Sequence, residues 1–111
     1  MLVKMENPLS SGGGIQTQIV LNTQNYNSTT GSTIQLEIPF NGTLKLFVAD
    51  YYGGSSLTQN GTTVTKIYME QNEHQGINYW EVQVNSSDTI ILNKGNNNGK
   101  MWGAMGVVTT E

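Results

Sequence analysis

Cysteine and arginine are both absent from this 111-residue sequence. Without cysteine, neither disulfide bonds nor thiolate metal ligands can support the fold. Without arginine, and with five lysines against eight acidic residues, the chain lacks the basic surface and the guanidinium groups that recognise phosphate. We therefore exclude nucleic acid as a partner. Charged residues make up only 12% of the chain, so we expect a nearly neutral surface rich in amides and hydroxyls.

Long hydrophobic runs are also missing. No stretch approaches the ~20 apolar residues that cross a bilayer, so we expect no membrane span. Residues 1–8 lack the apolar region of a signal peptide, so we expect no signal peptide either. A chain of this length is typical of one domain with one hydrophobic core.

Residues suited to catalysis or metal binding are scarce. The one histidine, His74, lies close to Glu70 and Glu73, and a small metal-dependent enzyme would need these side chains to converge in space. A solvated loop is the more common explanation, and no G-x-S-x-G nucleophile motif is present. Asp50 and Asp88 could contribute to a calcium site, although aspartates at turns more often cap backbone N–H groups. We predict that the protein is not an enzyme and has no catalytic residue, metal site or cofactor.

The chain divides into an arm and one domain. Residues 1–14 end in a Ser-Ser-Gly-Gly-Gly run, which predicts a flexible N-terminal arm. In residues 15–111, apolar and polar side chains alternate as in half-buried β-strands. The predicted strands include residues 15–21, 33–38, 43–50, 78–84, 89–92 and 101–109. The alternation predicts one core-facing set in each of three of them: Ile34, Leu36 and Ile38; Leu44, Leu46 and Val48; and Trp80, Val82 and Val84.

Two turns connect predicted strands. Asn60-Gly61 predicts a type I′ hairpin turn that pairs Leu57 with Val64, with a second arm that continues to Met69. The segment 39–42, Pro-Phe-Asn-Gly, predicts another turn, whose final glycine tolerates positive φ, and therefore a second hairpin between the strands at 33–38 and 43–50. Together, the strands and turns predict an all-β fold: a small antiparallel β-sandwich or jelly roll of about eight short strands.

The C-terminal strand has apolar or small side chains on both faces. Trp102, Ala104, Gly106 and Val108 alternate with a second set, which consists of Met101, Gly103, Met105 and Val107. A strand at the surface of a monomeric sandwich should alternate with polar residues instead. We therefore predict a homo-oligomer with the second set at its interface. The alternative is a monomer that places this strand centrally in a sheet.

Two polar loops contain the residue types that bind sugars. Aromatic rings stack on sugar rings, and amides hydrogen-bond to hydroxyls. The candidate sugar-binding residues are Tyr51, Tyr52, Asn96, Asn97, Asn98 and Trp102. Buried aromatics and a merely soluble asparagine-rich loop are the alternative interpretation.

Two stretches resemble trimeric jelly-roll heads of the tumour-necrosis-factor and complement type, a design also found at the tips of bacteriophage fibres and in collagen-like bacterial spore proteins. The first is residues 34–44, IQLEIPFNGTL, which is similar to a strand, turn and strand near the start of such domains. The second is residues 80–92, WEVQVNSSDTIIL, with the closing strand at 101–108. The resemblance implies a trimer with a binding or structural role on a virion.

These observations lead to one functional hypothesis and two alternatives. We expect a non-enzymatic virion-associated protein of a phage tail, fibre or head decoration, made in the host cytoplasm and located in the virion. Its expected partners are copies of itself, other virion proteins and a cell-surface glycan. The first alternative is a free carbohydrate-binding module or lectin. The second is the small metal-dependent enzyme considered above.

Overall fold

The computed structural model describes residues 14–24, 33–51, 54–72, 75–93 and 101–110, and the predicted arm lies almost entirely outside them. The described residues form nine β-strands and no helix, which confirms the all-β prediction. The strands are β1 (Thr17–Gln24), β2 (Thr33–Leu36), β3 (Gly42–Tyr51), β4 (Ser56–Gln59), β5 (Thr62–Thr63), β6 (Tyr68–Asn72), β7 (Gln75–Val84), β8 (Ile90–Asn93) and β9 (Met101–Thr110).

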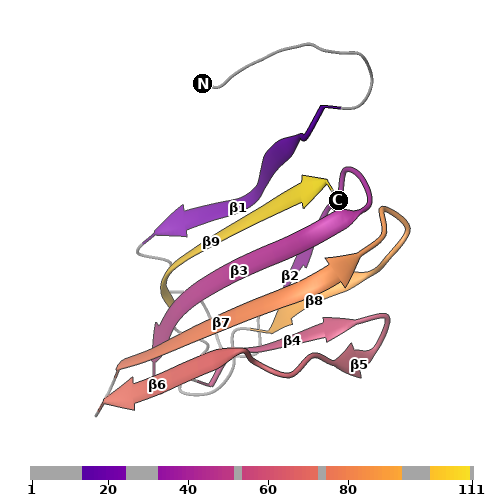
Figure 1. The fold of residues 1–111 in the computed structure, drawn as a ribbon. Helices are drawn as coiled ribbons and strands as arrows, with labels where there is room; N and C mark the ends of the chain where they lie inside the picture. Colours follow the sequence, from indigo (N-terminus) through magenta and orange to yellow (C-terminus); the bar gives the residue numbers. More distant parts are fainter. Residues whose placement is uncertain (1–13, 25–32, 52–53, 73–74, 94–100, 111) are drawn as a thin grey trace.

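The strands form two antiparallel sheets packed face to face (Figure 1). The larger sheet has the order β1-β9-β3-β7-β6, and the smaller has the order β2-β8-β4-β5. The first four strands of the chain alternate between the two sheets, and β8 and β9 return beside β2 and β1. This is the arrangement of a jelly roll, with β6 added at one edge of the larger sheet.

The core lies between the two sheets. Its buried side chains come from the inward positions of the alternating strands: Leu36, Ile38, Leu44, Leu46, Val48, Leu57, Trp80, Val84, Ile90, Leu92, Ala104 and Val108. Trp80 is completely buried, and its indole N–H donates to the carbonyl of Val64 at 3.1 Å. The inward faces predicted for β2, β3, β7 and β9 therefore match the structure, because the period-2 pattern specifies which residues share a face.

The chain turns between β2 and β3 where the sequence predicts it, but the predicted hairpin was wrong, because β2 pairs with β8 in the smaller sheet and β3 pairs with β7 and β9 in the larger. Glycine also has a different role at this turn. Gly42 does not have a positive φ. It is buried between β7 and β9, and a Cβ atom at this position would collide with the carbonyl oxygen of Thr109. The sequence interpretation was wrong on this point, because close approach of a distant strand leaves no local signal.

The Asn60-Gly61 hairpin is confirmed. Both residues have positive φ, 52° and 87°, as a type I′ turn requires. The predicted partners also meet, since the amide of Val64 donates to the carbonyl of Leu57 at 2.8 Å.

The second arm of the hairpin does not continue to Met69, so that prediction was wrong. β5 ends at Thr63, and the chain then crosses to the larger sheet. There the amide of Ile67 donates to the carbonyl of Tyr79 at 2.8 Å, and β6 pairs with β7. An alternating pattern marks a strand but does not identify its partner, so the crossing was not visible in the sequence.

Candidate functional site

The outer face of the larger sheet, which points away from the core, carries an unusual row of side chains. Met105, Phe47, Tyr79 and Tyr68 lie directly opposite one another on β9, β3, β7 and β6. We call these four residues the aromatic row. Met105, Phe47 and Tyr68 are 43%, 46% and 51% exposed. The solvated face of an antiparallel sheet is normally polar, so this row is a candidate contact surface.

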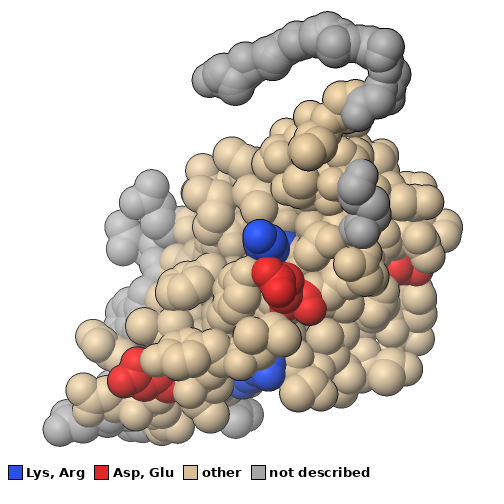
Figure 2. Space-filling view, viewed as in Figure 1, with Lys and Arg blue, Asp and Glu red and all other residues tan. Residues whose placement is uncertain are grey.

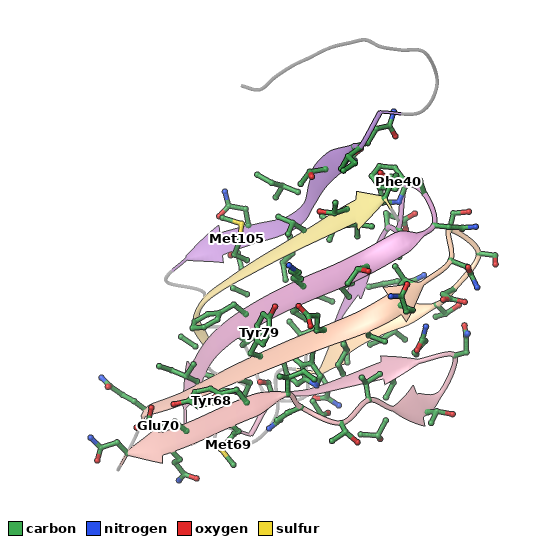
Figure 3. The ribbon with its side chains drawn as sticks, viewed as in Figure 1. Phe40, Tyr68, Met69, Glu70, Tyr79 and Met105 are labelled. Carbon is green, nitrogen blue, oxygen red and sulfur yellow. The ribbon has the colours of Figure 1, made fainter. Side chains whose placement is uncertain are left out.

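Two rings of the aromatic row, those of Phe47 and Tyr79, contact each other across β3 and β7. The centroids of Phe47 and Tyr79 are 6.4 Å apart, and their planes are tilted by 52°. This is within the range of favourable aromatic pairs. Tyr79, Tyr68 and Glu70 extend the same surface toward the β6 edge (Figure 3).

A carboxylate anchors each tyrosine of the row. The Tyr68 hydroxyl donates to Glu70 Oε1 at 2.7 Å, and the Tyr79 hydroxyl donates to Glu81 Oε2 at 3.1 Å. The hydrogen bond to Glu70 and its negative charge raise the pKa of the Tyr68 phenol. Partial burial and the contact with Glu81 raise the pKa of the Tyr79 phenol. Both phenols therefore stay neutral at physiological pH and hold their rings in place.

A shallow polar depression adjoins the aromatic row along β3, β7 and β9. Its lining residues are Thr43, Lys45, Glu81, Gln83, Thr109 and Thr110. Lys45 Nζ lies 3.7 Å from Glu81 Oε2, and the Gln83 amide donates to Thr43 Oγ1 at 3.2 Å. The depression therefore presents hydroxyl, amide, ammonium and carboxylate groups within one small area.

The β1–β9 half of the outer face has a different character. Neither strand contains a charged residue. Ile19, which is 55% exposed, lies opposite Val107, and Met105 is the next outward residue along β9. This half is therefore uncharged, and its apolar side chains Ile19, Val107 and Met105 lie beside polar ones, since Asn22 is opposite Met105. The half formed by β3, β7 and β6 combines aromatic rings with charged groups. On the face shown in the space-filling view, charged side chains are few (Figure 2).

Along β9, the alternation of side chains separates the predicted interface residues from the core residues. Gly103, Met105 and Val107 are on the outer face, and the intervening Ala104 is buried in the core. The side chain of Met101 lies outside the described part of the structure. β9 lies between β1 and β3, so it is central within its sheet. This central position pairs both edges of β9 but leaves its outer face uncovered by the described residues.

The predicted sugar-binding residues fall outside what the structure describes. This holds for Tyr52, Asn96, Asn97 and Asn98 entirely, and for the side chains of Tyr51 and Trp102. The aromatic row was missed because its four members are far apart in the sequence. Its only sequence signal was the outward alternation of Tyr79 with Glu81 and Gln83.

Metal binding finds no support among the described residues, which contain no group of three or more candidate ligands. Two members of the Glu70, Glu73 and His74 cluster lie outside the described residues, and Glu70 binds the Tyr68 hydroxyl.

The two aspartates of the calcium hypothesis lie at opposite ends of the β3–β7 pair. Buried Asp50 accepts hydrogen bonds from the amide of Ser55 at 2.9 Å and from Asn78 Nδ2 at 2.8 Å. Asp88, in the turn after β7, accepts one from the amide of Asn85 at 2.8 Å. Both aspartates bind N–H donors, as turn-capping residues do.

Comparisons of the chain with protein-family models, with curated proteins and with solved structures found no match. Among the described residues, no helix is long and apolar enough to span a membrane.

Proposed function

We propose that the protein is a non-enzymatic structural or attachment subunit of a virion, from a phage tail, fibre or head decoration, and that it acts as a homo-oligomer. A trimer is the expected state. The observation that carries the proposal is the exposed apolar surface on the β1–β9 half of the outer face.

A contact with another subunit accounts for the exposed apolar side chains on this half of the face better than exposure to water does. Ile19, Val107 and Met105 form an apolar surface without a charged residue on either strand. Burial of apolar area is worth roughly 25 cal/mol per Å², and no ion on these strands has to be desolvated. A second copy of the chain would cover this surface and remove it from water.

The virion setting is supported by the sequence resemblance to trimeric heads together with the jelly-roll fold. Jelly rolls occur both in viral capsid proteins and in lectin domains. The fold is therefore equally compatible with the alternative of a free lectin, because a fold alone does not identify a function. The chemistry of the aromatic row and the polar depression suits a sugar ligand, which an attachment subunit and a free lectin would both bind. If the protein binds sugar as a monomer, that result would support the free lectin.

Light scattering on the purified chain at micromolar concentration tests the oligomer. We expect a mass near three times the 12.1 kDa of one chain. A monomeric mass would contradict the proposal. Genes for tail or capsid proteins next to the gene for this chain would support the virion setting, and a neighbouring gene for a secreted enzyme would support the free lectin.

A further inference from the structure

The aromatic row and the polar depression meet on the two central strands of the larger sheet. β3 and β7 pair over ten residues each, from Gly42 opposite Val84 to Tyr51 opposite Gln75. On the outer face of β7, the side chains from the polar end to the aromatic end are those of Gln83, Glu81 and Tyr79. On the outer face of β3, the corresponding side chains are those of Thr43, Lys45 and Phe47. A ligand along this pair would therefore contact polar groups at one end and aromatic rings at the other.

We propose that this surface binds a neutral carbohydrate, with Phe47 and Tyr79 as the stacking residues and with Lys45, Glu81 and Gln83 as hydrogen-bonding residues. The inference rests on the attachment role proposed above and names the ligand class and the site for it. It places the sugar site on the face of the sheet, away from the loop residues that the sequence suggested.

A sugar matches both chemistries of the surface. Its C–H faces are apolar enough to pack on Phe47 and Tyr79, and its hydroxyls both donate and accept hydrogen bonds. Glu81 accepts from a hydroxyl, Lys45 donates to one, and the Gln83 side chain can do both. Few other ligands are apolar on their faces and bear many hydroxyls at their rims.

Charge argues against the competing ligands. The carboxylates of Glu70 and Glu81 border the row and would repel phosphate or sulfate groups, and Lys45 is already within 3.7 Å of Glu81. An apolar protein partner would have to take the Glu70 carboxylate and the Lys45–Glu81 ion pair out of water, and the desolvation costs several kcal/mol per ion. A sugar hydroxyl instead replaces a water molecule at each carboxylate.

The site is also preorganised. The Tyr79 ring is held between its contact with Phe47 and its hydrogen bond to Glu81, on a strand paired on both sides. Side chains that are already ordered lose little rotamer freedom when a ligand binds. This favours measurable affinity from a small contact area.

Affinity electrophoresis in native gels tests the site with defined probes. The neutral probes are dextran, a galactomannan and a β-1,3-glucan, and heparin is the anionic probe. We expect at least one neutral probe to retard the protein and heparin to have no effect. Tyr79→Ala and Phe47→Ala should each weaken the retardation at least about tenfold. Glu81→Gln should weaken it less, and Tyr79→Phe should retain most of it because the ring remains.

Met69→Ala is the matched control. Met69 is 50% exposed but lies opposite buried Asn78, so it points to the other side of the sheet, and its loss should leave retardation unchanged. The inference is overturned if no neutral probe retards the protein. It is also overturned if neither Tyr79→Ala nor Phe47→Ala weakens the retardation.

The mass of each variant separates this inference from the oligomer proposal. Binding by a monomer contradicts only the oligomer. An oligomer that binds no neutral probe contradicts only the sugar site. If Tyr79→Ala dissociates the oligomer, the aromatic row belongs to the subunit contact, and the sugar site is overturned.

Discussion

Asp88 illustrates how one side chain can join two segments of the chain that are distant in sequence. Its carboxylate accepts hydrogen bonds from the amide of Asn85 at 2.8 Å, from Gln59 at 2.9 Å and from Asn60 at 3.0 Å. These contacts tie the β4–β5 hairpin to the turn after β7. They also lower the pKa of Asp88 below its ordinary value, with the backbone hydrogen bond from Asn85 as the largest cause.

The lowered pKa predicts a specific pH dependence for Asp88→Asn. The folded protein prefers the ionised carboxylate, so Asp88 stabilises the fold fully above its unfolded pKa near 3.8 and progressively less as the pH falls through the lower, folded pKa. The variant should therefore melt below the parent at neutral pH, and the difference should shrink below about pH 4. Thermal melts between neutral and acidic pH measure this difference in melting temperature between variant and parent. Glu37→Gln is the control for removing one exposed negative charge. A difference that persists at the acid end would contradict the prediction.

The β4–β5 hairpin is the element that the sequence specified most completely. Asn60 and Gly61 both occupy the positive-φ region that a two-residue type I′ loop demands. Asn60 also connects to the turn beside it, since its Oδ1 accepts from the amide of Thr89 at 2.8 Å and its Nδ2 donates to Asp88. The turn therefore depends on both the backbone conformation and one amide side chain.

We predict that the double variant Asn60→Ala with Gly61→Val lowers the free energy of unfolding by about 2–4 kcal/mol. Backbone strain at positive φ and two lost hydrogen bonds each contribute about 1 kcal/mol or more. Urea denaturation measures the change, and Gly61→Ala alone isolates the backbone part. Thr62→Ala, an exposed change on the same hairpin, should stay within about 0.5 kcal/mol. A double variant as stable as the parent would contradict the role of the turn.

At the scale of the whole molecule, the outer face of the larger sheet is divided between two chemistries. The β1–β9 half is uncharged and exposes the apolar side chains of Ile19, Val107 and Met105, and the other half combines aromatic rings with carboxylates and a lysine. Met105 belongs to both the aromatic row and the proposed subunit contact and so marks the boundary between the two surfaces. A subunit contact on the first half leaves Phe47, Tyr79 and Glu81 available to a ligand. The two proposals are therefore compatible on one sheet and can be tested separately.

The division predicts that Met105→Lys and Val107→Lys dissociate the oligomer, because an unpaired charge buried in an interface costs about 3–5 kcal/mol. Light scattering measures the mass of each variant. Met69→Lys introduces the same charge at a similarly exposed position on the opposite side of the sheet and should leave the mass unchanged. An oligomer that survives both substitutions on β9 would place the interface elsewhere.

The sequence by itself determined the local features of this protein. Alternation identified the strands and the buried faces, including Trp80 and Val84, and Asn60-Gly61 identified a hairpin, because these signals arise between residues close in the chain. Only the tertiary structure decided which strands pair. Strand pairing joins distant segments through backbone hydrogen bonds that any residue can make, so it moved β6 into the larger sheet and brought Thr109 against Gly42. The aromatic row exists for the same reason, since Tyr68, Tyr79 and Phe47 become neighbours only through the register of three strands.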